Sequence, residues 1–340
     1  MQTVLLTGAS GYIAKHIVVQ LLHAGYAVRG SLRNLNRADE VRAAVLPHLT
    51  GPLGDRLTFV PLDLEHDAGW ATALTGVDVL MHTASPFPMA QPKDPADLIR
   101  PAVQGALRAL NAAKAAGVMR VILTSSSAAV AGGPLPTGKT TFDEGDWTDP
   151  NAPGTSAYTR SKTLAERAAW DFVRDDAPQM RLTTINPVFV VGPPLDAHFG
   201  TSVSVIERLL NGRDPMIPQF GFATVDVRDV ALAHVLALTT PGTAGKRYIA
   251  ADQFLWFTDM ARILKTNFPT RKIVTRRAPD FVVRILGLFD KSIATIVPML
   301  GRRDEVSGAR AQADLGLKFR DVRRSVVETA QFLIDQKLVK

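Results

Sequence analysis

Short apolar runs alternate with amphipathic stretches along the first half of the chain, and this alternation restricts the possible folds more than any other feature. Apolar residues at helical spacing occupy Tyr12–His23, Pro95–Ala116 and Tyr158–Arg174. Strands that alternate with helices form a parallel sheet covered on both faces and connected by right-handed crossovers. The sequence therefore predicts an α/β fold built on a doubly wound, Rossmann-type parallel sheet. Its expected strands are Thr3–Thr7, Ala27–Leu32, Leu57–Leu62, Val79–Thr83, Arg120–Thr124 and Leu182–Asn186.

The pattern changes after Pro187, where Gly192–Pro194 and Asp214–Pro218 interrupt the chain. The remainder mixes helices with short strands, which indicates a smaller C-terminal mixed α/β lobe for the substrate. A strand-like run at Lys246–Ala250 and a helical run at Val230–Thr239 are expected to return to the parallel sheet. We therefore expect a discontinuous Rossmann domain of residues 1–186 plus about 222–250, and a substrate lobe of about 187–221 plus 251–340.

The composition excludes several classes of protein. The 340 residues include no cysteine, which rules out disulfides, thiolate metal sites and a cysteine nucleophile. The start of the chain lacks the basic segment and cleavage site of a secretory signal, so we expect a cytoplasmic protein. The apolar stretch Phe281–Leu300 contains charged residues and Pro298, and cannot supply the roughly 20 apolar residues of a membrane span. We expect an amphipathic helix there.

A formal net charge of +7 raises the question of nucleic-acid binding. The Lys and Arg residues are scattered, and pairs such as Arg271-Lys272 and Arg276-Arg277 lack the interleaved aromatic residues of a base-stacking surface. We interpret the charge as a solvated basic surface that favours an anionic cofactor. The expected partner is a small molecule and not a nucleic acid, and the protein is expected to be a monomer or a homodimer.

A glycine-rich turn, Thr7–Ala14, follows the first predicted strand and leads into the first helix. Its glycines permit a tight turn and a close approach of the backbone, and the small Ala14 lets the helix pack against the strand. The N-terminus of a helix offers free N–H groups and a partial positive charge to a pyrophosphate. We therefore predict a dinucleotide-binding loop that consists of Gly8, Ser10, Gly11, Tyr12 and Ile13.

The second predicted strand distinguishes between the two nicotinamide cofactors. NAD-specific sites carry an acidic residue at its end, which binds the ribose hydroxyls. Here Ala27–Asn34 contains no acid, and Arg33 stands where the 2′-phosphate of NADP would lie. Arg33, together with Arg37, is predicted to favour NADP(H); the alternative is that both are ordinary surface arginines. Asp63 and Leu64, after the third strand, are predicted to lie beside the adenine.

Tyr158 and Lys162 are four residues apart at the start of a predicted helix, so both lie on one face of it. A phenol has a pKa of about 10, too high to exchange protons readily at neutral pH. A fixed positive charge beside it stabilises the phenolate and lowers that pKa. In isolation the pair is also typical of a solvated helix face. The serines Ser125–Ser127 favour a catalytic role, because they end the fifth predicted strand, where the crevice of the sheet opens.

Together, the glycine-rich turn, the serine run and the Tyr-Lys pair resemble those of the extended short-chain dehydrogenases/reductases over nearly the whole chain. Within that superfamily the sequence is similar to the dihydroflavonol-reductase-like aldehyde and ketone reductases, through His82–Phe87, Asn186-Pro187 and Asp226–Ala231. The resemblance implies that an NADP(H)-dependent enzyme reduces the carbonyl of a small aldehyde or ketone to an alcohol.

The resemblance also implies roles for individual residues. Ser126 would be the catalytic serine, with Ser125 as the alternative; Tyr158 would donate the proton, and Lys162 would bind the nicotinamide ribose and lower the pKa of the tyrosine. Phe87 and Phe189 would be pocket walls, although both are equally typical of a core. The implied cofactor contacts are Thr83, Ala84, Ser85, Thr124, Tyr158, Lys162, Pro187 and Val188, and the implied substrate pocket is Ser85, Phe87, Ser126, Tyr158 and Phe189.

Two differences from related enzymes narrow the range of expected substrates. The plant flavonoid reductases carry an asparagine shortly after the catalytic serine, where this chain has Ala131. The cinnamoyl-CoA reductases carry Asn-Trp-Tyr-Cys around the tyrosine, where this chain has Ser156–Thr159. Neither plant substrate is therefore expected. A sugar-nucleotide epimerase or dehydratase and a hydroxysteroid dehydrogenase share the fold and the triad and remain alternatives. So does a non-catalytic NADP-sensing regulator, against which the Tyr-Lys pair argues.

The remaining polar residues indicate structural roles. His82, His198 and His234 lack the spacing of metal ligands, so no metal site is expected. Asp226 and Asp229 are expected to form a turn and a helix cap. A serine hydrolase would need a Gly-x-Ser-x-Gly elbow, and the sequence contains none.

Overall fold

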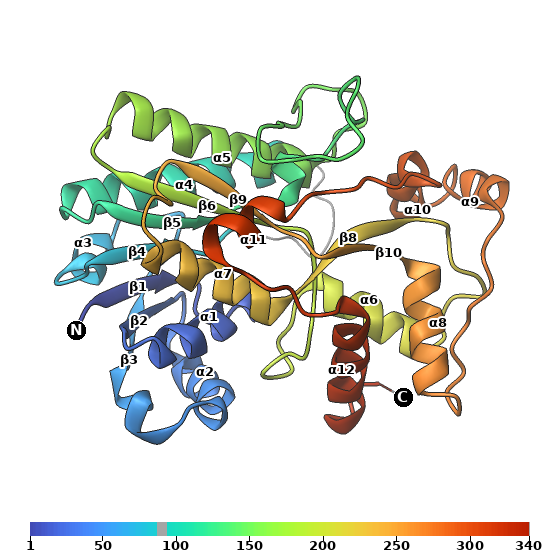
Figure 1. Ribbon diagram of the computed structural model, residues 1–340, viewed down its shortest axis with the longest axis horizontal. Coiled ribbons are helices and arrows are strands. Elements are labelled where there is room, and N and C mark those ends of the chain that lie inside the picture. The colour runs from blue at the N-terminus through green and yellow to red at the C-terminus, as the bar shows by residue number, and fades with distance from the viewer. Residues whose placement is uncertain (87–93, 340) are drawn as a thin grey trace.

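A parallel sheet of seven strands forms the centre of the computed structural model, which describes residues 1–86 and 94–339 (Figure 1). The strand order is β3-β2-β1-β4-β5-β6-β9, and all neighbouring strands are parallel. This order is that of a doubly wound sheet, so the predicted α/β class and Rossmann-type sheet are confirmed. The strands are β1 (Thr3–Thr7), β2 (Ala27–Leu32), β3 (Leu57–Pro61), β4 (Val79–His82), β5 (Arg120–Thr124), β6 (Arg181–Pro187) and β9 (Lys246–Ala250).

Helices cover both faces of this sheet. On one face, α1 (Tyr12–His23), α2 (Ala38–Val45) and α7 (Val227–Thr239) share a hydrophobic core with the strands. On the other face, α3 (Trp70–Leu74), α4 (Ala96–Ala115) and α5 (Ala157–Asp175) share a second one. Figure 1 shows α4 and α5 side by side above the sheet, and α1 and α7 below it. The strands are therefore buried on both sides, as their apolar sequences predict.

Two buried aspartates fix the start of α7, as expected from the sequence. The carboxylate of Asp226 accepts the backbone N–H of Arg228 at 2.7 Å and its guanidinium at 2.6 Å. The carboxylate of Asp229 accepts the backbone N–H of Arg320 at 2.6 Å. The structural role predicted for both residues is confirmed: Asp226 caps the first turn of α7, and Asp229 connects α7 to the C-terminal segment.

A small sheet lies beyond the carboxyl ends of the main strands and contains β7 (Phe189–Val191), β8 (Gly221–Asp226) and β10 (Gln253–Trp256). Helices α6 (Thr201–Leu210), α8 (Phe257–Asn267) and α12 (Val322–Asp335) pack beside it (Figure 1). As expected, Lys246–Ala250 joins the main sheet, where it pairs with β6. Strand β8 pairs with β7 and β10 instead, although the expected boundaries assign most of it to the Rossmann domain. Those boundaries stay a prediction.

The segment Phe281–Leu300 is not one amphipathic helix, so that expectation is wrong. It contains α9 (Asp280–Leu286) and α10 (Lys291–Ile296), and a 3-10 turn, Val297–Met299, includes Pro298; α11 (Ala309–Leu315) follows. Gly287 follows α9, and a Cβ there would lie 3.0 Å from the side chain of Val297. Over the residues that the structure describes, no helix is long and apolar enough to cross a membrane.

Arg120, at the start of β5, is a buried arginine that connects three parts of the fold. Its guanidinium donates to the carbonyl of Arg181 at 2.7 Å and to that of Ala237 at 2.5 Å. It also donates to the hydroxyls of Thr183 at 2.8 Å and Thr243 at 2.9 Å. Burial lowers the pKa of Arg120 to about 10, so the side chain is charged at neutral pH. It therefore joins β5 to β6 and to the C-terminal end of α7.

Replacing Arg120→Met should lower the free energy of unfolding by about 3 kcal/mol, because two buried carbonyls lose a charged donor. Urea unfolding followed by circular dichroism measures this loss. The matched control is Arg181→Met, since Arg181 is exposed and its replacement should change the unfolding free energy by less than about 0.5 kcal/mol. Equal effects of the two substitutions would contradict the structural role of Arg120.

Candidate active site

The predicted site residues come from distant parts of the chain, and the parallel sheet brings them to one edge. Strands β1, β4, β5 and β6 are consecutive neighbours, so their carboxyl ends lie next to one another. These strands end at Thr7, His82, Thr124 and Pro187. The crevice at this edge is where open α/β sheets bind ligands, and the glycine turn, Thr83–Ser85, the serines and Val188 all follow directly.

The glycine turn requires glycine at position 8. The φ angle of Gly8 is +68°, and a Cβ there would lie 3.0 Å from the Cβ of Ala84. The N–H of Gly11 donates to the carbonyl of Gly8 at 2.9 Å and closes the turn. The residue before α1, Gly11, has no side chain to cap the helix, which leaves first-turn N–H groups for an anion. This arrangement fits a pyrophosphate.

Thr7 joins the glycine turn to the loop after β4. Its hydroxyl accepts the N–H groups of Thr83 and Ala84, each at 3.1 Å, and therefore donates to Nδ1 of His82 at 2.9 Å. The hydroxyl of Thr83 donates to the carbonyl of Thr7 at 2.5 Å. Burial lowers the pKa of His82 to about 4, so its neutral ring is a structural acceptor. The structure thus brings Thr83 and Ala84 against the glycine turn.

The two arginines predicted to select NADP(H) have different surroundings. Arg33 is exposed after the end of β2. Arg37 donates to the hydroxyl of Ser10 at 3.3 Å and to the carboxylate of Glu40 at 2.7 Å. Arg37 therefore contacts the glycine turn directly, and a phosphate bound there would share this guanidinium with Glu40.

Asp63 and Leu64 follow β3 as expected, and both make contacts within the fold. The carboxylate of Asp63 accepts the N–H of Glu65 at 3.0 Å. The carbonyl of Leu64 accepts a hydrogen bond from Arg108, and the side chain of Leu64 packs against the core beneath α4. Their predicted contact with adenine stays a prediction.

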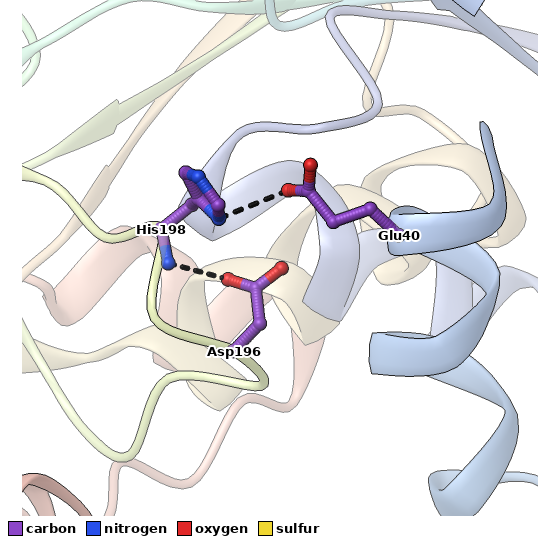
Figure 2. Close-up of side chains that lie close together, drawn as sticks. All are labelled: Glu40, Asp196 and His198. Carbon is purple, nitrogen blue, oxygen red and sulfur yellow. Dashed lines mark hydrogen bonds and ion pairs between the residues drawn. The ribbon is translucent and has the colours of Figure 1, made fainter. Parts of the chain in front are cut away.

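Figure 2 shows Glu40, Asp196 and His198 close together; one potential ligand atom from each lies within 4.8 Å of the others. Cations already face both carboxylates, since Arg37 pairs with Glu40 and the buried Lys15 pairs with Asp196. Nδ1 of His198 lies 3.0 Å from Glu40. We interpret the cluster as an ion-pair network that joins α1 and α2 to the segment after β7, rather than as a metal site.

Tyr158 and Lys162 lie on one face of α5, and Ser126 approaches them from the loop after β5. The hydroxyl of Tyr158 donates to Oγ of Ser126 at 3.4 Å, and Nζ of Lys162 lies 5.9 Å from the centroid of the Tyr158 ring. Burial raises the pKa of Tyr158 and lowers that of Lys162 to about 8. At neutral pH the site therefore combines a protonated phenol with a neighbouring ammonium group.

The two candidate serines differ in what their hydroxyls contact. Ser125 donates to the carboxylate of Glu166 at 2.5 Å, on the core side of the loop. Oγ of Ser126 contacts Tyr158 and also accepts the N–H of Ala128 at 3.1 Å. A hydroxyl has one proton to donate, and that of Ser125 is committed to Glu166. Ser126 is therefore the serine that accompanies the tyrosine.

Two predicted cofactor residues use their side chains for the fold. The hydroxyl of Thr124 donates to Nε2 of His234 at 2.7 Å, because Nδ1 of this ring donates to the carbonyl of Val230. The hydroxyl of Tyr12 donates to the carbonyl of Gly192 at 2.7 Å, which ties α1 to the segment after β7. Any cofactor contact of Thr124 or Tyr12 would therefore come from other atoms.

The structure describes the surroundings of only some of the residues predicted to form the substrate pocket. Phe189 belongs to an aromatic cluster at the small sheet, where it stacks on Phe222 with ring centroids 5.5 Å apart. Ser85 lines a cavity of about 20 Å³ together with Lys162 and Thr124. Phe87 lies outside the described residues. The contribution of these residues to a substrate pocket stays a prediction.

Sequence reasoning missed Glu166 and Arg247. Glu166 is 1% exposed and accepts a hydrogen bond from Nε of Arg247 at 2.7 Å. A signal for Glu166 was present, since it follows Lys162 by four residues and so continues the helix face of the Tyr-Lys pair. No comparable signal exists for Arg247, because only the pairing of β9 with β6 brings it to this place.

Comparisons with known proteins show which chains and folds this protein resembles. A family model described as the NAD dependent epimerase/dehydratase family matches residues 4–251. A cinnamoyl-CoA reductase of Medicago truncatula is 36% identical over 339 residues, which cover 98% of this chain and 96% of that protein. Yeast methylglyoxal/isovaleraldehyde reductase Gre2, solved in complex with NADPH, is 30% identical with a TM-score of 0.79, over 99% of this chain and 100% of that chain. Vestitone reductase from alfalfa is 25% identical with a TM-score of 0.75, over the full length of both chains.

Replacing Gly8→Ala should raise the Kd for NADPH at least about tenfold, because the new methyl group meets Ala84 and displaces the turn that would hold the pyrophosphate. Fluorescence titration with NADPH measures the change. The control is Gly25→Ala, which also has a positive φ, +89°, but no atom within 4 Å of its added Cβ. This control should lose stability and keep its NADPH affinity. An unchanged Kd in the Gly8 variant would contradict binding of the pyrophosphate at the glycine turn.

Proposed function

The chain belongs to the NAD dependent epimerase/dehydratase family, and on that premise we propose that it is an NADPH-dependent reductase of small aldehydes or ketones. The observation that carries the proposal is the contact between the hydroxyls of Tyr158 and Ser126, 3.4 Å apart, with Lys162 on the next turn of α5. This contact lies at the edge of the sheet where the glycine turn lies. The relatives named as reductases, one of them solved with NADPH, support a reductase that uses this cofactor.

The residues at the glycine turn fit the cofactor. The missing Cβ of Gly8 and the uncapped first turn of α1 suit a pyrophosphate. Arg37 contacts Ser10 at the same turn, and Arg33 is exposed nearby, so both suit the 2′-phosphate that distinguishes NADP from NAD. When bound, NADPH supplies the hydride.

The protein supplies the proton and the electrostatic environment. Ser126 and Tyr158 together hold the carbonyl oxygen of the substrate, and their hydroxyls stabilise the negative charge that develops on it. Tyr158 transfers its proton to that oxygen, which completes the alcohol. The resulting phenolate lies beside the ammonium of Lys162, whose positive charge makes the transfer favourable. Catalysis therefore depends on the position of three side chains from two elements.

The substrate class that we propose is a small aldehyde or ketone, with α-functionalised and aromatic carbonyls as the first members to examine. The plant substrates are not proposed, because Ala131 replaces the asparagine of the flavonoid reductases and Ser156–Thr159 replaces the pattern of the cinnamoyl-CoA reductases. Yeast Gre2, a methylglyoxal/isovaleraldehyde reductase, supports a small carbonyl compound.

The direct test is consumption of NADPH, followed by its absorbance, with a panel of aldehydes, α-keto esters, diketones and aryl ketones. NADH is tested in parallel. Turnover with NADPH on any member supports the proposal. NADPH binding without consumption across the panel would contradict it and favour an epimerase or a cofactor sensor.

Replacing Tyr158→Phe should lower kcat/KM for carbonyl reduction by about a hundredfold to ten-thousandfold and leave the Kd for NADPH unchanged, since only the proton donor is lost.

Replacing Ser126→Ala should lower kcat by about a hundredfold or more. The matched comparison is Ser125→Ala, which should cost less than about a tenth of the Ser126 effect, because Ser125 contacts Glu166 and not Tyr158. The reverse order of the two serine variants would contradict the assignment.

Replacing Arg33→Ala and Arg37→Ala should each raise KM for NADPH by about ten- to a hundredfold, because a charge-assisted contact to a phosphate is lost. The KM for NADH is the internal control and should change by less than about twofold, since NADH lacks the 2′-phosphate. Steady-state kinetics with both cofactors measure the ratio. Equal changes for NADPH and NADH would show that neither arginine reads the 2′-phosphate.

A further inference from the structure

A buried carboxylate, Glu166, lies one helical turn beyond Lys162 on the same face of α5. Tyr158, Lys162 and Glu166 are spaced four residues apart, so the three side chains follow one another along that face. Glu166 is 1% exposed. A buried carboxylate is costly unless it is paired and hydrogen-bonded, so its surroundings need an explanation.

Five hydrogen-bond donors surround this carboxylate. One oxygen accepts from Ser125 at 2.5 Å and from the side chain of Asn186 at 2.7 Å. The other accepts from Arg247 at 2.7 Å and the indole of Trp170 at 3.3 Å. The hydroxyl of Thr184, 3.1 Å away, shares its one proton between this oxygen and Oδ1 of Asn186 at 3.0 Å. Both oxygens act as acceptors, which is the hydrogen-bonding pattern of an ionised carboxylate. Glu166 is therefore a fixed negative charge behind the candidate catalytic residues.

Lys162 and Glu166 line the same cavity of about 20 Å³. This volume is sufficient for about one water molecule, so a single water can connect the ammonium to the carboxylate. Ser125 and His82 line the cavity as well, and helix α4 contributes only Ala102 and Ala106. Among the residues described as lining this cavity, Glu166 is the only carboxylate.

We propose that Glu166 is a positioning residue: it is the buried counter-ion that keeps Lys162 in its ammonium form beside Tyr158. This inference rests on the proposed function, in which the ammonium assists the proton transfer. Glu166 also fixes the loop of Ser126, because Ser125 donates to its carboxylate and Asn186 donates both to that carboxylate and to the carbonyl of Ser126 at 3.2 Å. One charge thus positions the lysine and the serine together.

The electrostatic need for a counter-ion follows from burial. Burial lowers the pKa of Lys162 to about 8, and the charge of Glu166 opposes this decrease. Among the residues that the structure describes, the other charged or titratable groups that face the pair are Tyr158 on α5, His82 on β4 and Arg247 on β9. His82, with a pKa of about 4, is neutral near pH 7, so Arg247 is the further cation of this described set. Without Glu166, Lys162 would lose its proton close to neutral pH.

Arg247 provides a control variant in which the pKa of Lys162 should change in the opposite direction. Its guanidinium also donates to the carbonyls of Glu144 at 2.9 Å and Asp146 at 2.8 Å, and it stacks on Trp147, 3.8 Å from the ring centroid. Removing this positive charge should raise the pKa of Lys162, whereas removing the charge of Glu166 should lower it. A purely structural role for the two residues predicts no such opposition.

The experiment is an NMR titration of 13C-labelled lysine in the substrate-free protein, with the Lys162 signal assigned by its loss in Lys162→Met. We expect Glu166→Gln to lower the pKa of Lys162 by roughly one unit or more, and Glu166→Asp, which keeps the charge, to restore most of it. Arg247→Met should raise this pKa, and Arg247→Lys should leave it close to that of the natural protein. Circular dichroism establishes that each variant is folded.

A pKa of Lys162 that is the same in Glu166→Gln and in the natural protein overturns the proposal. If Glu166→Gln does not fold, the Arg247 pair decides: a pKa that stays constant or falls in Arg247→Met overturns it as well. This titration needs no substrate, so it gives an answer even if the reductase activity is absent. If the reductase activity is present, the alkaline limb of kcat/KM for reduction should move to lower pH in Glu166→Gln by the shift that NMR measures.

Discussion

The candidate site depends on the hydrogen bonds of the buried Glu166 carboxylate, because they join four elements that lie far apart in the sequence. Glu166 belongs to α5, and its donors come from the loop after β5, from β6 and from β9. Each of these elements ends at the crevice or carries a residue that lines it. A charge in this position is stable only if all of its partners are present, so the network also fixes how β5, β6 and β9 align at that edge.

A second set of polar contacts joins the segment after β7 and helix α12 to helices α1 and α7. The hydroxyl of Tyr12 donates to the carbonyl of Gly192, and Lys15 pairs with Asp196, one of the three residues drawn in Figure 2. Glu328 on α12 accepts from Arg228, whose guanidinium also pairs with Asp226. These contacts begin at α1 and α7, the helices that flank the glycine turn and the crevice on one face of the sheet. The lobe that is proposed to choose the substrate is therefore anchored close to the loop that is proposed to hold the cofactor.

Buried histidines show how the same fold separates structural from chemical roles. His82 and His234 each lie at the edge of the crevice and each contact a threonine hydroxyl, Thr7 or Thr124. Burial lowers the pKa of both rings to about 4, so neither is protonated at neutral pH, and both are committed to loop geometry. Among the described residues, Tyr158 and Lys162 are the pair that is proposed to transfer a proton and to stabilise charge.

The sequence by itself determined the elements of the main sheet and the residues Gly8, Tyr158 and Lys162, because strand periodicity, turn glycines and helical spacing are local properties of the chain. It did not predict that Phe281–Leu300 is divided among α9, α10 and a 3-10 turn, where Gly287 and Val297 from separate turns approach each other closely. It left Ser125 and Ser126 as alternatives, since adjacent residues have the same local signal. Only the tertiary structure distinguished them, by placing Glu166 against Ser125 and Tyr158 against Ser126. Spacing along the chain decides which face of a helix or strand a side chain occupies. Which distant residue it contacts is decided by the tertiary structure, since the strand order that places β9 beside β6 is what brings Arg247 to Glu166.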